Sequence, residues 1–349
     1  MTLTSEQPAV ARPEIVAVVP AFNAGGFIEP CIAALKATGF APAEIIVVDD
    51  ASTDDTVARC RAAGVEPLRL EGNSGPSAAR DAGLRASDAP IVLFVDADVF
   101  VAPDGRAVAA AFFAENPGYA AVFGAYDDAP LIDTRLSRLR NLLHRHVHRS
   151  EAGDAVTFWT GLGALRREAY EAVGGFSPTS RFMEDVELGM KMAQAGYKIR
   201  LQPALEGKHA KEWRFFELLR TDIWGRAVPW VRLMRSTFGR SLPMTHAASV
   251  WGRLSVLSVG VGLLAVPGLL IVPGLALGVI VLSLLALGLI NRSFLGSLWK
   301  RRGVLEAAAG LGVLWLYYLC GGIGFALVAT GLDRPLSGAG ARLRRLLAR

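Results

Sequence analysis

The chain has 349 residues, of which 52% are hydrophobic, and carries a formal net charge of +5 at pH 7. Its length allows one large domain or two smaller ones, and the apolar excess, which lies mostly after residue 250, excludes a wholly soluble protein. The three cysteines, Cys31, Cys60 and Cys320, are too far apart for a disulfide framework or a metal site. Residues 1–12 lack an apolar core, so we expect a flexible N-terminus and no signal peptide.

Short apolar runs predict four strands in the first 100 residues, at 15–19, 45–48, 65–70 and 91–95. Apolar residues at helical spacing lie between them, for example from Phe27 to Leu35. Strands that alternate with helices through short connections form a parallel sheet with right-handed crossovers. The sequence therefore predicts an α/β fold with a mostly parallel sheet flanked by helices.

Acidic residues follow two of these strands directly. Asp49 and Asp50 end the second strand, and Asp96 and Asp98 follow the fourth. Open α/β sheets bind ligands at the carboxyl ends of their strands, so we expect both pairs on one rim. Hard oxygen ligands there suit Mg²⁺ or Mn²⁺ with a substrate diphosphate. The alternative is that these aspartates only terminate strands, since Asp is common in turns.

Six segments in this order resemble the successive signatures of family 2 glycosyltransferases. The resemblance covers about residues 14–210 and implies a nucleotide-diphospho-sugar-binding fold of the GT-A (Rossmann-like) type. One such motif would be a weak signal, whereas several in order are a strong one. The segments are 18–23 (VVPAFN), 48–54 (VDDASTD), 73–83, 96–98 (DAD), 158–167 with 174–176, and 184–188 (EDVEL).

The resemblance also implies roles for residues at the donor site. Pro20, Phe22 and Asp49 would contact the base and ribose of the donor. Asp98 would ligate the metal, with Asp96 on the ribose or the metal. A bound cation neutralises the charge that develops on the diphosphate leaving group.

Two further residues have two interpretations each. Arg80 would pair with a donor phosphate, or with a buried carboxylate as a structural ion pair. His209 resembles a third metal ligand or a diphosphate contact in some related enzymes, although a lone histidine is more often a packing residue.

Asp185 is the general base that the resemblance implies. An acceptor hydroxyl must lose its proton as it attacks the anomeric carbon, and a carboxylate within hydrogen-bond reach can take it. A single displacement inverts the anomeric configuration. The alternative is that Glu184, Asp185 and Glu187 are first-turn acids favoured by the helix dipole.

The composition changes at residue 211. From Lys211 to Arg240, tryptophan, phenylalanine and leucine alternate with arginines, a pattern typical of amphipathic helices in the headgroup layer; the alternative is that these helices pack on the catalytic domain. Residues 211–214 (KEWR) do not match the Gln-x-x-Arg-Trp motif of processive synthases in this family, which argues against a processive polymerase.

Residues 254–290 carry no charge and contain Pro267 and Pro273. Because one span needs about 20 residues, we expect a hairpin of two transmembrane helices. Residues 304–332 form a third apolar segment. Because no signal peptide is expected and nucleotide sugars are cytosolic in bacteria, we expect the catalytic domain in the cytoplasm of a multi-pass inner (plasma) membrane protein. The basic loop 291–303 then also lies in the cytoplasm, as the positive-inside rule requires. The third segment then either crosses the membrane or returns through a bend at Gly321 and Gly322.

We therefore expect a membrane-anchored, metal-dependent inverting glycosyltransferase of the cell envelope. Its partners would be a nucleotide-diphosphate sugar, a lipid or lipid-linked glycan acceptor with a free hydroxyl, and membrane lipid, but no nucleic acid. The alternatives are a polyprenyl-phosphate glycosyltransferase and a catalytically silent membrane scaffold. The expected divisions are a flexible N-terminus (1–12), a GT-A catalytic domain (13–210), interfacial helices (211–248), a transmembrane region (249–332) and a basic tail (333–349).

Overall fold

The computed structural model describes residues 14–177, 182–236 and 249–333. The expected flexible N-terminus and all but the first residue of the expected basic tail lie outside this part. The chain forms two compact units. The N-terminal unit comprises residues 1–127 and 152–210, and the C-terminal unit comprises 128–151 and 211–349. The domain limits given above stay a prediction.

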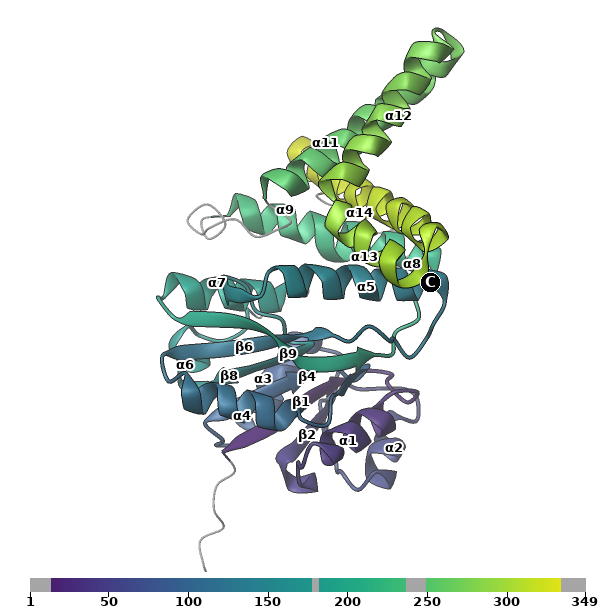
Figure 1. Ribbon diagram of the computed structural model, residues 1–349. Helices are drawn as coiled ribbons and strands as arrows, with labels where there is room; N and C mark the ends of the chain where they lie inside the picture. Colours follow the sequence, from purple (N-terminus) through teal and green to yellow (C-terminus); the bar gives the residue numbers. More distant parts are fainter. Residues whose placement is uncertain (1–13, 178–181, 237–248, 334–349) are drawn as a thin grey trace, which may run out of the picture. The chain divides into compact units, whose positions relative to one another are not determined.

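The N-terminal unit is built on a nine-stranded sheet with the strand order β3-β2-β1-β4-β8-β6-β9-β5, in which β7 pairs with β9 (Figure 1). Its first four strands are parallel, as the alternation of apolar runs and helices predicts. They are β3 (Leu68–Arg69), β2 (Ile45–Asp49), β1 (Ile15–Ala21) and β4 (Ile91–Val95).

The other half of the sheet is mixed. β8 is antiparallel to both β4 and β6, whereas β6 and β9 are parallel. β5 and β7 are antiparallel to β9. The α/β fold class is thus confirmed, with the antiparallel pairings confined to the part after β4. These strands are β8 (Leu162–Arg166), β6 (Tyr119–Tyr126), β9 (Lys198–His209), β5 (Val99–Val101) and β7 (Gly153–Ala155).

Helices cover both faces of this sheet. Alternate side chains of β1 enter different cores: Ala17 and Val19 pack with residues of α1 and α4, whereas Val16 and Val18 pack with residues of α3, α6 and α7. A strand buried on both faces has a continuous apolar sequence, which explains the runs seen above. The helices are α1 (Ile28–Ala37), α2 (Thr56–Ala62), α3 (Pro76–Arg85), α4 (Gly105–Glu115), α6 (Arg167–Ala172) and α7 (Glu184–Gln194), with a 3₁₀ turn at Pro42–Glu44.

The described part of the C-terminal unit is helical. Leu139 and Leu143 of α5 are buried in one cluster with Val259, Leu287 and Phe294, which groups this helix with the C-terminal segments. The helices are α5 (Arg135–Ser150), α8 (Phe215–Arg220), a π-helical stretch (Thr221–Ala227), α9 (Val228–Arg235), α11 (Val250–Ala265), α12 (Pro273–Ile290), α13 (Arg292–Arg302) and α14 (Val304–Thr330).

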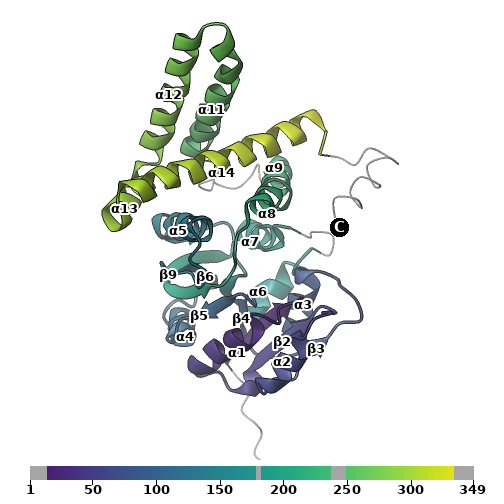
Figure 2. The ribbon, with the colours of Figure 1, turned by 90° about the vertical axis from the view of Figure 1, so that its right-hand side faces the viewer.

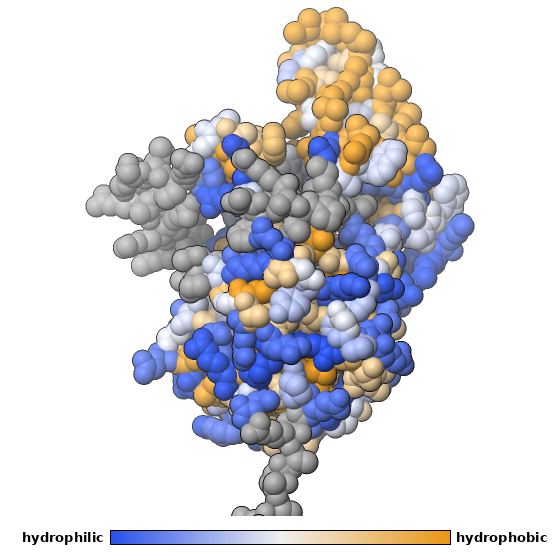
Figure 3. Space-filling view, turned by 90° about the vertical axis from the view of Figure 1, so that its left-hand side faces the viewer, coloured by the Kyte–Doolittle hydropathy of each residue, from blue (hydrophilic) through white to orange (hydrophobic). Residues whose placement is uncertain are grey.

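Three helical segments of this unit are long and apolar enough to cross a membrane: 250–270, 273–290 and 304–330. The first two form the predicted hairpin, with Pro267 in a short 3₁₀ segment and Pro273 at the start of α12. Its surface is strongly hydrophobic (Figure 3), with Leu264 81% and Leu270 92% exposed. The third, α14, runs across the foot of the hairpin (Figure 2).

The α14 helix continues without interruption through Gly321 and Gly322. The alternative that the third segment turns back at these glycines is therefore wrong. Glycine lowers helix propensity by about 1 kcal/mol relative to alanine. Consecutive backbone hydrogen bonds and packing against neighbouring helices maintain the helix despite this.

Candidate active site

Three of the predicted donor-binding residues, Pro20, Phe22 and Asp49, lie at the ends of β1 and β2. The parallel register pairs Pro20 with Val48 and Ala21 with Asp49, so Phe22 follows directly beside Asp49. The Asp49 side chain is fully buried, and its carboxylate accepts the Ser52 N–H at 3.2 Å. Phe22, by contrast, is 49% exposed. The Asp49 carboxylate also lies 3.3 Å from Arg69 Nε, so both of these partners belong to the chain itself. The exposed Phe22 ring is free to stack on a nucleobase, whereas contact of Asp49 with the donor stays a prediction.

The loops after β1 and β2 are joined by hydrogen bonds that centre on Asn23. Its N–H donates to Ser52 Oγ, and its side-chain oxygen accepts the Thr53 N–H, both at 2.9 Å. Asn23 and Ala51 have φ angles of 50° and 60°, in a region that costs non-glycine residues about 1–3 kcal/mol. Such backbone strain clusters at functional sites. The structural role of Asn23 was not apparent from the sequence, because its partners lie about 30 residues later.

Asp50 serves a different purpose from Asp49. Its two carboxylate oxygens accept the N–H groups of Ser74 and Gly75 at 2.7 and 2.8 Å. These two residues immediately precede α3, and Gly75 has a φ of 90°. Asp50 therefore holds the start of α3 against the end of β2.

Arg80 of α3 joins the end of β4 to the start of α7. Its side chain is buried, and Nη2 donates to Asp96 Oδ1 while Nη1 donates to Glu184 Oε1, each at 2.7 Å. Burial lowers the pKa of Arg80, but the charges of Asp96 and Glu184 raise it by more, so the pKa lies above its ordinary value. This geometry favours the ion-pair interpretation of Arg80; contact with a donor phosphate stays a prediction.

Asp185 lies in the first turn of α7, beside Glu184. Its Oδ2 accepts the Thr160 N–H at 3.3 Å, and its Oδ1 accepts the Val186 N–H at 2.8 Å. Burial and the Glu184 charge raise the pKa of Asp185 to about 7, against the lowering effects of Arg80 and the two N–H groups. A carboxylate with a pKa near neutrality has the property that a general base needs.

Asp98 and His209 are brought together by the pairing of β5 with β9. Val99 is the register partner of His209, and the Ala210 N–H donates to the Asp98 backbone oxygen at 2.8 Å. His209 Nε2 then lies 3.8 Å from Asp98 Oδ2. The Tyr126 ring stacks on the imidazole with centroids 4.2 Å apart, a contact that the sequence did not reveal.

The fit of this pair to a divalent cation can be tested by distance. Two ligands of one octahedral Mg²⁺, each at about 2.1 Å, lie roughly 3.0 Å apart when adjacent and roughly 4.2 Å apart when opposite. The Asp98–His209 separation of 3.8 Å lies between these values, so a small movement of one side chain would let both bind one cation. Among the residues that the structure describes, no three His, Cys, Asp or Glu side chains gather as a metal-binding group, and the Asp96 carboxylate is paired with Arg80. Further ligands would therefore be oxygens from outside the chain, as in sites where Mg²⁺ is bound by one or two carboxylates plus substrate phosphates.

Comparisons with known proteins agree with this fold. Residues 16–174 match the family model described as Glycosyl transferase family 2. The structure resembles a mannosyltransferase from Pyrobaculum calidifontis, solved with GDP-Man and Mn²⁺, over 94% of this chain and 89% of that one (TM-score 0.56, 20% identity).

Two curated relatives act in polysaccharide synthesis, according to their names. The O-antigen chain rhamnosyltransferase RfbN of Salmonella typhimurium is 23% identical over 63% of this chain and 74% of its own length. The succinoglycan biosynthesis protein ExoU of Rhizobium meliloti is 36% identical over 100 residues, which is 27% of this chain and 29% of that protein.

The sheet order and the structural likeness define the N-terminal unit as a GT-A fold, the fold of nucleotide-sugar transferases. The chain therefore contains a glycosyltransferase family 2 domain at residues 16–174. The resemblance of its strand-end motifs to that family is thus confirmed.

Proposed function

We propose that the protein is a membrane-anchored, divalent-metal-dependent inverting glycosyltransferase. It transfers a sugar from a nucleotide-diphosphate sugar to a hydroxyl of a lipid or lipid-linked glycan in cell-envelope polysaccharide synthesis. The observation that carries the proposal is the placement of Asp185 in the first turn of α7, where the Thr160 and Val186 N–H groups hold its carboxylate and burial raises its pKa to about 7, because an acceptor hydroxyl needs a base. The names of RfbN and ExoU support a glycan acceptor.

In this proposal Pro20, Phe22 and Asp49 hold the nucleoside, and Asp98 with His209 holds Mg²⁺ or Mn²⁺. A bound cation supplies positive charge that stabilises the departing diphosphate. Asp96 contacts the donor ribose or the cation.

Asp185 accepts the proton of the acceptor hydroxyl. The hydroxyl oxygen forms a bond to the anomeric carbon while the bond from that carbon to the diphosphate oxygen breaks. Attack from the side opposite the leaving group inverts the anomeric configuration. Thr160 supports this role, since its N–H donates to the base.

The proposed orientation has the catalytic domain on the cytoplasmic face of the inner membrane. Its support is the basic segment between α12 and α14, which carries Arg292, Lys300, Arg301 and Arg302. If α11 and α12 both cross the membrane, this segment lies on the same side as the N-terminal unit. Positive charge in short loops favours the cytoplasmic side.

The donor site is tested by calorimetric titration of the detergent-solubilised chain with UDP and GDP, with and without Mn²⁺. We expect metal-dependent binding of one nucleotide, which Asp98→Ala abolishes. If neither nucleotide binds, the proposal is contradicted and the silent-scaffold alternative is favoured.

The acceptor class is tested with Asp185→Asn. A lost general base lowers the rate by about 10²–10⁴-fold, whereas nucleotide binding is expected to stay unchanged. Glu187→Gln, in the same helical turn, is the matched control. Full activity of Asp185→Asn would favour the polyprenyl-phosphate alternative, because an anionic phosphate acceptor needs no base.

A further inference from the structure

A basic pocket lies within the C-terminal unit, between α5 and α13. Its volume is about 630 Å³. Residues from the C-terminal parts of both helices line it. The charged residues that line it are Arg145, Arg149, Arg301, Arg302 and Asp128.

The charges of this pocket do not balance. The lining residues include four guanidinium groups and one carboxylate, a difference of three positive charges; Asp133, outside the lining, is close enough to Arg302 for the two charges to interact. Asp128 Oδ2 is 2.8 Å from Arg301 and 3.8 Å from Arg145. Partial burial raises the pKa of Asp128, but these two arginines lower it overall. The pocket is therefore suited to an anion that carries more than one negative charge.

The pocket differs from an ordinary solvated basic surface. The Arg145 side chain is only 17% exposed, and Leu298, which is 3% exposed, forms part of the lining. Cations at helix C-termini are favoured by the helix dipole, which explains one basic helix end. It does not explain why two such ends line one cavity. Arginine binds phosphate oxygens through two parallel N–H donors, so a phosphate ester is the ligand that this set of residues fits.

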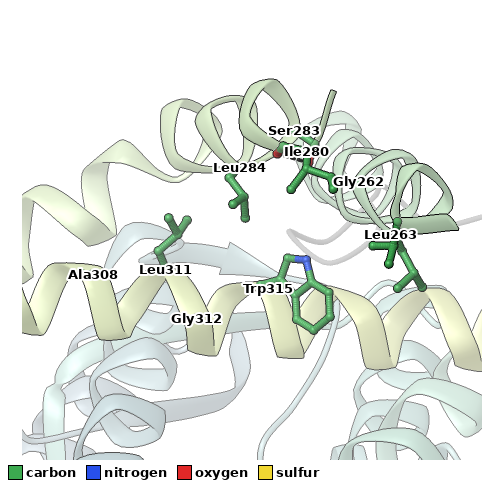
Figure 4. Close-up of a pocket in the computed structure, with 10 residues that line it drawn as sticks. Gly262, Leu263, Ile280, Ser283, Leu284, Ala308, Leu311, Gly312 and Trp315 are labelled. Atoms are coloured by element: carbon green, nitrogen blue, oxygen red, sulfur yellow. Dashed lines mark hydrogen bonds between the residues drawn. The ribbon is translucent and has the colours of Figure 1, made fainter. Parts of the chain in front are cut away.

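The position of the pocket in the chain indicates where that phosphate comes from. α13 directly follows α12 and precedes α14, and both are candidate membrane spans. Basic pockets next to transmembrane helices bind the head groups of anionic lipids. A second cavity of about 420 Å³ opens in the same unit between the α11–α12 hairpin and α14, with Leu263, Leu284 and Trp315 directed into it and no charged residue in its lining (Figure 4). Such a cavity suits a hydrocarbon chain.

We propose that the α5–α13 pocket binds the phosphate-bearing head group of a membrane lipid. Anionic phospholipids and lipid-linked diphosphates share this chemistry. The inference rests on the proposed membrane association but not on the donor site, so it adds a second anion-binding site to the protein.

The test uses the full chain in detergent and three probes: dihexanoyl phosphatidic acid, dihexanoyl phosphatidylcholine and inorganic pyrophosphate. We expect saturable binding of phosphatidic acid and not of phosphatidylcholine. Arg301→Gln should weaken it by at least about tenfold, the effect of losing a charge-assisted hydrogen bond. Asp128→Asn should strengthen it, since it removes the single acid of the lining. Arg292→Gln is the matched control, because this exposed arginine of α13 lies outside the pocket lining, and should leave binding unchanged.

Three results would overturn the inference. Equal losses in Arg292→Gln and Arg301→Gln would indicate diffuse surface charge. Pyrophosphate binding as tight as that of phosphatidic acid, and equally sensitive to Arg301→Gln, would indicate a soluble phosphate ligand. Absence of phosphatidic acid binding would exclude the site. The Mn²⁺-dependent titration with UDP and GDP is run on the same samples, so that failure of the donor site is recognised separately.

Discussion

Arg80 Nη1 donates to Glu184 Oε1 at 2.7 Å, across 104 residues of sequence. The bond joins α3, which follows the nucleotide-side loops, to the first turn of α7, where Asp185 lies. Because the same guanidinium also reaches Asp96, one buried side chain links the end of β4, on the proposed donor side, to the proposed base. It also lowers the pKa of Asp185.

Arg80→Lys is expected to impair catalysis through Asp185. One ammonium group cannot donate to Asp96 and Glu184 in the geometry of the guanidinium fork. A weaker electrostatic effect of residue 80 on Asp185 leaves the effect of burial less compensated, so the pKa of Asp185 rises. The pH at which kcat reaches half its maximum should therefore increase by about one unit. The pH profile of kcat measures this. Arg85→Lys, at an exposed arginine of the same helix that pairs with Asp81, should leave the profile unchanged. A lower melting temperature with an unmoved profile would show that Arg80 is only structural.

The unmodified enzyme should lose activity below about pH 7. A general base acts in its deprotonated form, and burial with the Glu184 charge raises the pKa of Asp185 to about 7. The value of kcat is therefore expected to rise about tenfold per pH unit up to that point and then level off. Saturating donor and acceptor concentrations isolate this step. A flat profile between pH 5 and 8 would contradict the assignment of Asp185 as base.

The same pKa shift predicts an effect on stability. Asp185 binds its proton more tightly in the folded state, so its stabilising contribution is complete at low pH. That contribution is lost as pH rises from about 4 towards 7. Asp185→Asn removes the buried charge. The difference in melting temperature between the variant and the unmodified protein should therefore be more favourable to the variant at pH 8 than at pH 5. A difference that is the same at both pH values would contradict the raised pKa.

The sequence predicted the strands β1, β2 and β4 well, because each is a short apolar run followed by Asp or Pro. It also placed Asp49 and Asp96 at strand ends, where a parallel sheet gathers them on one edge. It did not separate Glu184 from an ordinary first-turn acid, since its partner Arg80 lies far away in the chain. Tyr126 was missed for the same reason: its stacking on His209 depends on the pairing of β6 with β9. Likewise, α5 has apolar partners such as Val259 and Phe294, more than 100 residues later.

His209 is expected to contribute to cation affinity rather than to proton transfer. Its Nε2 lies 3.8 Å from Asp98 Oδ2, close enough for both side chains to become ligands of one cation after a small movement. His209→Gln should raise the Mn²⁺ concentration for half-maximal activity by roughly tenfold or more, with kcat largely restored at saturating Mn²⁺. Tyr126→Leu tests the stacked ring in isolation. An unchanged Mn²⁺ requirement in His209→Gln would leave the histidine as a packing residue.

Gly189, on the buried face of α7, sets how closely this helix approaches the segment before Thr160. A Cβ at Gly189 would clash with the Phe158 nitrogen and the Thr157 backbone, far inside ordinary van der Waals contact. Alanine favours helix by about 1 kcal/mol, but overpacking against backbone costs about 1–3 kcal/mol. We therefore expect Gly189→Ala to lower both the free energy of unfolding and kcat, since Thr160 would shift relative to Asp185. Urea denaturation of the folded chain measures the first effect. Gly118→Ala is the control, because a Cβ there meets nothing within 4 Å. If both variants were equally stable and active, close packing of α7 would not position the base.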